Sequence, residues 1–473
     1  MGTMTTLGTV VTKDFRDRTL RQFPALAHDR RYLAFLDLLL FGSFLEGSTR
    51  PQKVLPHRTI LEALGMSPTT RAREFTSGAF IDDLNKKVLG GKLLVGPYSH
   101  VRKKSRTVSI NNLGKAFLDS LNDELGSFHR TDDDTKVYFV SGAPWRPLNH
   151  TELRNADLAA ARRFPGVVPD AQRLIAYLNA LPSNLFTSSF VAKNMAKAVA
   201  TADKISNATV RRHHLALLHR IASQPQPFYG ASTDQKTVRI FARNPSLLQL
   251  RNDIKQALIA DWKTFDLRSA QLAIVAKDWG VASLAKLLAD SSTNVWKELS
   301  ATLGRLPVDV AKAAVKKGVY AIAYGAGKAT VGREIKSEIE DTLDEDRDVD
   351  VQPFFDHELV KDLFLYRTAT LDVVRRGRAV SDCFGRKLTC KTSAQARSVL
   401  AQLSQAQEML LLMPALDLAE KRPADLRIML WEHDGFTVHL RRPDRNESTK
   451  RALVKAVNDQ CKKLGYLTEL VEK

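Results

Sequence analysis

Two aspartates far apart in the sequence could share a metal site. Asp261 follows the short apolar stretch 257–260, which the pattern predicts to be a strand, and a helix is expected to open at residue 262. Asp434 lies in the turn 432–435, between two apolar runs predicted to pair as a hairpin. Two separate carboxylates suit a pair of Mg²⁺ ions about 3.5–4 Å apart, which clamp an in-line phosphoryl displacement.

Between these aspartates, a predicted helix carries two lysines and two tyrosines at intervals of four. They lie on one slowly rotating stripe, because each step turns the helix about 40° past a full turn; the four are Lys312, Lys316, Tyr320 and Tyr324, with Gly325 next. Ammonium groups suit a triphosphate and aromatic rings suit a base. Taken singly, each segment has a commoner structural explanation as a cap, a turn or an amphipathic surface, but together they indicate nucleotide chemistry.

The content and order of these segments resemble the polymerase domain of family A DNA polymerases, the bacterial DNA polymerase I type, and more distantly the bacteriophage single-subunit RNA polymerases. Residues 261–268 are similar to the family's first motif, Asp-Tyr-Ser-Gln-x-Glu-Leu-Arg, and 312–325 to its fingers helix, Arg-x3-Lys-x3-Phe-x3-Tyr-Gly. Residues 432–435 are similar to its last motif, Val-His-Asp-Glu. Segments around 237–249 and 385–387 resemble further family segments in the same order, so the resemblance covers about residues 170–473.

The resemblance implies an α+β polymerase right hand, with palm, fingers and thumb, and a role for each matching position. Asp261 and Asp434 would hold two Mg²⁺ ions, with the carbonyl of Trp262 as a further ligand. Lys316 would protonate the pyrophosphate leaving group. The incoming nucleotide would contact Lys312, Lys316, Tyr320, Tyr324 and, at its sugar, Asp266; primer and duplex would contact Arg239, Gln249, Arg268 and His433.

Departures from the family pattern leave the product open. Asp266 is shorter than the family's sugar-selecting Glu, Lys312 replaces an Arg, and Gly435 stands where the DNA enzymes have Glu. We expect DNA synthesis from dNTPs on a DNA template and primer. An RNA polymerase or primase using rNTPs is the second interpretation, and a non-catalytic DNA-binding replication initiator with a degenerate palm is the third.

The N-terminal part predicts a separate DNA-binding module. Helical patterns up to residue 125 enclose two predicted strands, joined by a basic loop that carries Arg102, Lys103 and Lys104. This order resembles a winged helix whose loop would lie on DNA phosphates; the alternative is a solvated basic hairpin. The region before residue 130 shows no acidic constellation of the kind a proofreading exonuclease needs. A compact polymerase with its own DNA-binding module would suit replication of a phage, plasmid or other mobile element.

We therefore expect five parts: a winged-helix-like domain over 1–130, a thumb-like helical region over 131–236, palm over 237–290, fingers over 291–400 and palm again over 401–473. The segment 325–330, Gly-Ala-Gly-Lys-Ala-Thr, suggests a P-loop, but Ile322 stands where the first Gly is required and Ala329 replaces the Ser or Thr. No NTPase site is predicted.

Composition agrees with a polyanionic partner. The 473 residues are 44% hydrophobic, enough for a sizeable core, and 71 Lys and Arg exceed 52 Asp and Glu to give a net charge of +19. Three cysteines form neither a disulfide framework nor a zinc spacing. The apolar stretches are too short to span a bilayer and the N-terminus lacks secretory features, so we expect a cytoplasmic monomer without a membrane partner.

Overall fold

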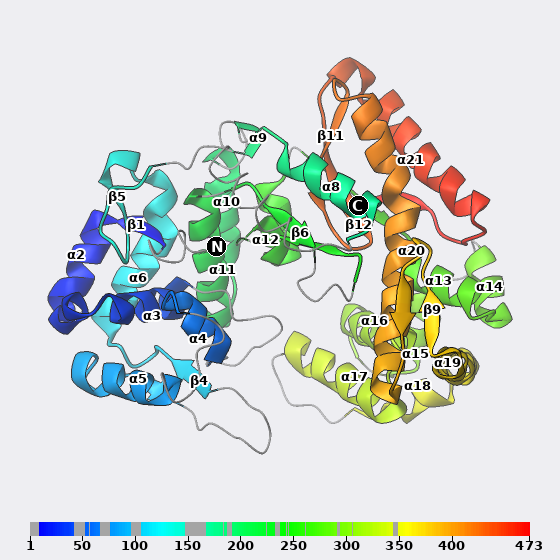
Figure 1. Ribbon diagram of the computed structural model, residues 1–473, viewed down its shortest axis with the longest axis horizontal. Helices are drawn as coiled ribbons and strands as arrows, with labels where there is room; N and C mark the ends of the chain where they lie inside the picture. Colours follow the sequence, from blue (N-terminus) through cyan, green and yellow to red (C-terminus); the bar gives the residue numbers. More distant parts are fainter. Residues whose placement is uncertain are drawn as a thin grey trace. The chain divides into compact units, whose positions relative to one another are not determined.

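The structure is a computed structural model and describes residues 9–41, 53–55, 57–66, 76–95, 106–146, 167–182, 184–186, 192–223, 225–231, 237–242, 244, 246–260, 262–290, 294–304, 306–343 and 349–473. The chain forms two compact units. Unit 1 comprises Met1–Ala160, Leu181–Phe228 and Ala242–Ala260, and unit 2 comprises Ala161–Ala180, Tyr229–Phe241 and Asp261–Lys473. Both contain many helices and small antiparallel sheets, so the α+β class is confirmed (Figure 1). The division into five parts stays a prediction.

The core of unit 1 lies among helices whose apolar faces carry phenylalanines. Phe15 lies at its centre, with its ring 6.2 Å from those of Phe41 and Phe117 and fully buried. The surrounding elements are α2 (Lys13–Gln22), α3 (Arg30–Phe41), α6 (Lys115–Ser127), α9 (Asn184–Phe186), α10 (Ala192–Asp203), α11 (Ala208–Ser223) and α12 (Asn252–Leu258), with β1 (Val10–Thr12) antiparallel to β5 (Lys136–Tyr138).

Between α3 and α6 the chain alternates helices with three short strands. In order these are β2 (Lys53–Leu55), α4 (His57–Ala63), α5 (Ser77–Asp83), β3 (Leu94–Val95) and β4 (Arg106–Ser109). The strands form an antiparallel sheet in the order β2-β4-β3. Lys86 and Lys87 follow α5 and are exposed. Arg102, Lys103 and Lys104 fall between β3 and β4, outside the described residues.

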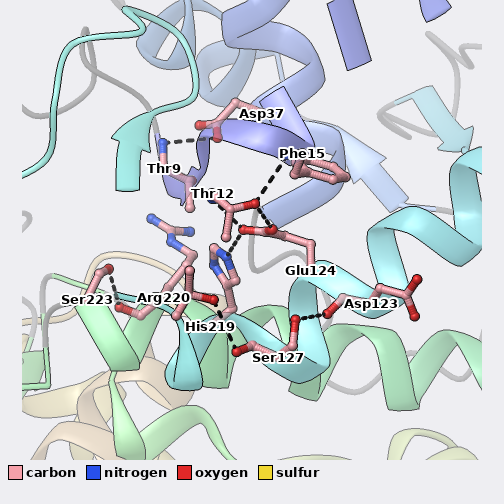
Figure 2. Close-up of polar contacts among 11 residues, drawn as sticks. Thr9, Thr12, Phe15, Asp37, Asp123, Glu124, Ser127, His219, Arg220 and Ser223 are labelled. Carbon is pink, nitrogen blue, oxygen red and sulfur yellow. Dashed lines mark hydrogen bonds and ion pairs between the residues drawn. The ribbon is translucent and has the colours of Figure 1, made fainter. Parts of the chain in front are cut away.

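A buried polar cluster joins the helices of unit 1 (Figure 2). The Glu124 carboxylate on α6 accepts hydrogen bonds from the backbone N–H (2.8 Å) and hydroxyl (2.5 Å) of Thr12, and its Oε1 lies 3.2 Å from His219 Nε2 on α11. Burial alone would raise the pKa of Glu124. The hydrogen bond and the charge of His219, together with the two hydrogen bonds from Thr12, outweigh burial and lower this pKa. Because Thr12 also caps α2 through Phe15 N–H (3.2 Å), one carboxylate fixes three elements.

Unit 2 contains a four-stranded antiparallel sheet in the order β11-β12-β8-β13. The hairpin predicted around residue 434 is confirmed as β11 (Leu426–Trp431) and β12 (Gly435–Leu440), with β8 (Lys263–Leu267) and β13 (Leu470–Glu472) beside it. Phe265 and Phe436 stack on its buried face, with ring centroids 5.9 Å apart. Helices near the sheet are α8 (Pro169–Asn179), α13 (Ala270–Asp278), α20 (Ser393–Lys421) and α21 (Asn446–Lys463).

The rest of unit 2 is mainly helical and shares one apolar core over 272–400. Close approach of two helices there depends on Gly318, since a Cβ at this position would lie 2.7 Å from the Ile335 side chain. The helices are α14 (Ala282–Ala289), α15 (Val295–Ala301), α16 (Val308–Ala323), α17 (Lys328–Leu343), α18 (Gln352–Asp356) and α19 (Glu358–Gly377). Two small sheets complete the list: β6 (Tyr229–Ala231) pairs with β7 (Ile240–Ala242), and β9 (Ala379–Ser381) pairs with β10 (Lys387–Thr389).

The local prediction around Asp261 was wrong. Residues 257–258, expected in a strand, end α12, and the helix expected from residue 262 is replaced by β8, with α13 beginning at Ala270. A short apolar run fits a buried helix end as well as a strand. In β8, buried Phe265 and Leu267 alternate with Thr264 and Asp266, which is the two-residue period of a strand.

Candidate active site

Two carboxylates approach each other where β8 meets the turn before β12. Asp266 in β8 lies opposite Gly435, and the N–H of Leu267 donates to the carbonyl of Asp434 over 2.9 Å. Burial and then the negative charge of Asp434 raise the pKa of Asp266 to about 6. The two acids therefore repel each other, as carboxylates held together for a metal do before it binds.

Gly435 makes this approach possible. A Cβ at position 435 would lie 2.3 Å from the carbonyl oxygen of Phe265 and 2.9 Å from Oδ1 of Asp266. Any side chain here would push β8 away from β12. The residue that departs from the family pattern is thus the one that lets Asp266 lie beside Asp434.

A lysine directly after the edge strand β13 pairs with the same acid. Lys473 Nζ lies 2.6 Å from Asp266 Oδ2, and its backbone N–H donates to the carbonyl of Thr264 over 3.0 Å. Lys473 acts against the repulsion described above, because its hydrogen bond and charge favour the ionised Asp266. Sequence analysis missed Lys473, since a single lysine after a short strand gives no signal of its own.

The lysine and tyrosine stripe lies on α16, as predicted. Burial, followed by the positive charges of Lys312 and Lys473, lowers the pKa of Lys316, while Asp266 and Asp434 act in the opposite direction. Lys316 therefore lies within the field of both carboxylates. Burial and then the charges of Asp434 and Asp266 raise the pKa of Tyr320, which places this ring at the same site.

Trp296 on α15 positions this stripe, and sequence analysis missed it. Its indole lies 5.3 Å from Lys316 Nζ and meets the Tyr320 ring edge-on at 6.0 Å. Its Nε1–H donates to the Ser269 hydroxyl over 3.1 Å. Ser269 is a non-glycine residue in the left-handed region, with φ 51°, a strained backbone often found at functional sites.

Behind Tyr324 lies a buried polar network. Arg239 pairs with Glu408 on α20 over 2.5 Å and donates to the Tyr324 hydroxyl over 3.4 Å. Glu408 also accepts a hydrogen bond from Gln271 on α13. Burial raises the pKa of Glu408, and Arg239 opposes that effect. A glutamate directly before the apolar run 409–413 was the sequence signal for this network, and it was missed.

The remaining predicted residues are dispersed. Arg268 is exposed and pairs with Glu469 over 2.9 Å, while His433 is exposed with its ring edge-on to Phe241 at 5.7 Å. Gln249 belongs to unit 1, where its side chain accepts from the Ser246 N–H in a capping box. Trp262 is buried before β8. Asp261 lies outside the described residues.

The described residues contain no cluster of three or more His, Cys, Asp or Glu side chains that could hold a metal. Asp266 and Asp434 nevertheless fit Mg²⁺, which typically takes one or two carboxylates and completes its coordination with water and substrate phosphates. Their mutual repulsion is the electrostatic signature of such a pair.

No family model and no curated protein matches this sequence. A solved structure described as the POL domain of Pol1 from M. smegmatis in complex with DNA primer-template and dNTP is similar with a TM-score of 0.41 and 14% identity. The match covers 68% of this chain and 63% of that one, so this chain spans less than two thirds of that domain. A similarity at this level carries no argument about function. Among the helices that the structure describes, none combines the length and apolar character that a membrane span requires.

Proposed function

We propose that this protein is a template-directed nucleotidyltransferase, in the first place a DNA-directed DNA polymerase without a proofreading exonuclease. One observation carries the proposal: Asp266 lies opposite Gly435, next to Asp434, and Trp296, which is hydrogen-bonded to Ser269 just after β8, contacts Lys316 and Tyr320 of α16. Acidic groups for metal, cations for phosphate and a ring for a nucleoside are the parts that phosphoryl transfer needs.

In this proposal Asp266, in place of Asp261, is the partner of Asp434 in holding Mg²⁺. The register of β8 supports the change, because Asp266 lies opposite Gly435 and is repelled by Asp434. With Asp266 assigned to Mg²⁺, we do not propose that it also selects the sugar of the nucleotide. When bound, two Mg²⁺ ions would activate the primer hydroxyl and stabilise the developing charge on the leaving pyrophosphate.

The other residues would bind and orient the nucleotide. Lys312 and Lys316 would pair with the triphosphate, and Tyr320 would pack on the sugar and base. The 3′-oxygen attacks the α-phosphorus and the bond to the bridging oxygen of pyrophosphate breaks. Lys316 would give its proton to that oxygen, a transfer that its lowered pKa assists. Arg239, held by Glu408, would fix the hydroxyl of Tyr324 near the template base.

For unit 1 we propose DNA binding. Its order of helix, strand, two helices, two strands and helix, with the sheet order β2-β4-β3, supports the proposal of a winged-helix-like module. Lys86 and Lys87 would lie near the groove, and Arg102, Lys103 and Lys104 on the phosphates. A polymerase with such a module would replicate a phage, plasmid or other mobile element.

The deciding experiment is extension of a labelled primer on a DNA template with Mg²⁺, with dNTPs and rNTPs supplied separately. Extension with dNTPs alone that is abolished by Asp266→Asn and by Asp434→Ala supports the proposal. Lys361→Gln, an exposed charge change in unit 2, is the matched control. Extension with rNTPs would identify an RNA polymerase or primase. Loss of all incorporation with retained duplex binding would point to the non-catalytic initiator.

A further inference from the structure

A basic pocket lies where the chain turns from α16 into α17, and neither Asp266 nor Asp434 is among the residues that line it. It has a volume of about 430 Å³ and is lined by Gly327, Lys328, Thr330, Arg367, Arg375 and Arg397, among others. None of the described residues that line it is acidic. Four cations around one hollow need an anion to balance them.

The cations repel one another in the absence of such an anion. Burial, and then the charges of Arg397 and Arg375, lower the pKa of Arg367. Arg367 is held in place because it donates to the carbonyl of Gly325 over 2.6 Å. Its Nε is buried, and the described residues offer it no hydrogen-bond partner. Asp372 engages Arg375 over 2.9 Å, outside the pocket lining.

The backbone of the turn favours the same kind of ligand. Gly325 has φ 82°, which a glycine adopts without strain, and space beside Gly327 is open. In the first turn of α17, the N–H groups of Thr330 and Val331 both donate to the carbonyl of Gly327 over 3.0 Å, so only those of Lys328 and Ala329 are left to face the N-terminal side of the helix. Sequence analysis rejected 325–330 as an NTP-hydrolysing P-loop, and the structure does not place it after a strand either. It does place these residues against three arginines.

We propose that this pocket binds a phosphate group, and specifically a backbone phosphate of a single-stranded template. The source is indicated by a neighbouring groove of about 570 Å³, which shares Thr330 and Arg397 with the pocket. The groove is also lined by Tyr320, Tyr324, several alanines, and the pair Lys317 and Glu334, whose charges lie 3.7 Å apart. A base beside the tyrosines would leave the next phosphates of its strand at the arginines. This inference rests on the proposed function for its choice of strand, and free phosphate is the other source of the same chemistry.

The test measures binding without catalysis. The full chain carrying Asp434→Ala is titrated in EDTA, by fluorescence anisotropy, with a duplex bearing a 5′ single-stranded overhang and with the same duplex blunt-ended. The variant adds Lys328→Gln, Arg375→Gln and Arg397→Gln. Its matched control adds Lys361→Gln, Arg376→Gln and Lys391→Gln, three exposed cations of the same unit that do not line the pocket.

We expect the pocket variant to bind the overhang DNA about ten-fold more weakly than the control variant, with blunt duplex unaffected. Its salt dependence should be shallower by about 2, since each phosphate contact on a single strand contributes about 0.7 to the slope. Equal overhang affinity for both variants would overturn the proposal. Melting curves of both variants establish that they are folded.

Two further arms change the ligand. In the first arm, methylphosphonate linkages remove the negative charge of the backbone in the overhang. Unchanged affinity for this neutral overhang would also overturn the proposal. In the second arm, inorganic phosphate and pyrophosphate are titrated without DNA. If the pocket variant loses affinity for these ions but keeps its affinity for the overhang DNA, the pocket is a site for free phosphate instead. Failure of the unmodified chain to extend a primer would refute the proposed function and leave these binding results interpretable.

Discussion

Replacing Gly435 by alanine should separate the two carboxylates while preserving their chemistry. The new Cβ would lie 2.3 Å from the Phe265 carbonyl oxygen and 3.1 Å from the Asp266 Cα. Both are backbone atoms, fixed by the pairing of β8 with β12 and β13. Reaching the ordinary contact distance of 3.4 Å requires the strands to part by about 1 Å at this pair.

That movement has two measurable consequences. Overpacking of this kind costs about 1–3 kcal/mol of the stability of unit 2. A displacement of about 1 Å in a catalytic geometry typically costs about 10²-fold in rate. We expect primer extension by Gly435→Ala to fall by about that factor in single-turnover assays, because Asp266 and Asp434 no longer hold one metal site together.

Gly377→Ala is the matched control. Gly377 ends α19 in the same unit, with nothing within 4 Å of an added Cβ and no positive φ, so this variant should be as stable and active as the unmodified protein. Denaturant unfolding and primer extension are measured on both variants. A Gly435→Ala protein with unchanged stability and rate would refute the inference that the close approach of β8 and β12 builds the site.

Three other changes test the charges. Because the pKa of Asp266 is raised, the folded protein binds the proton of this carboxyl more tightly than the unfolded chain does, and the fold loses stability as pH rises through about 6. Asp266→Asn should therefore melt at a higher temperature than the unmodified protein at pH 8. Calorimetry should show no such difference below pH 3.8. Lys473→Ala removes the cation 2.6 Å from Asp266 and should tighten Mn²⁺ binding roughly three-fold, as measured by electron paramagnetic resonance. The control is Lys455→Ala, which removes a lysine from a surface ion pair on α21. Equal Mn²⁺ affinities of the two variants would contradict the prediction. In unit 1, Glu124→Ala should cost about 3–5 kcal/mol because it leaves buried His219 and half-buried Thr12 without their acceptor. Exposed Asp123→Ala next to it should change the stability by no more than about 0.5 kcal/mol. Similar losses for both variants in urea unfolding would show that the cluster does not stabilise the unit.

Features set by local pattern could be predicted from the sequence. The hairpin around Asp434 has apolar runs on both sides of a turn, and the α16 stripe repeats every four residues, so each follows from a period along the chain. Gly325 follows the C-terminal end of α16 with φ 82°, and a glycine in this conformation is a common way to end a helix. These signals can be recognised without knowing which other segment of the chain packs against each element.

Contacts between distant segments could not be predicted in this way. Lys473 reaches Asp266 because β13 pairs with β8, and Glu408 joins Arg239 to Gln271 across three elements. Glu408 is next to an apolar run and Lys473 gives no signal of its own, but in both cases the partner is fixed by sheet order and helix packing. Burial of the charge indicates the role only after the fold is known.

The segment around the first aspartate shows how a motif match can meet a local structure other than the expected one. Both Asp261 and Asp266 precede a helix-forming run, and matching by residue type favoured Asp261. In a strand, successive side chains alternate between faces, so with Phe265 and Leu267 in the core, Asp266 must point to the other face. Gly435 opposite it then admits its carboxylate beside Asp434. The glycine that counted as a departure from the family pattern, taken together with the strand period, therefore supports the proposal that Asp266 is the partner of Asp434.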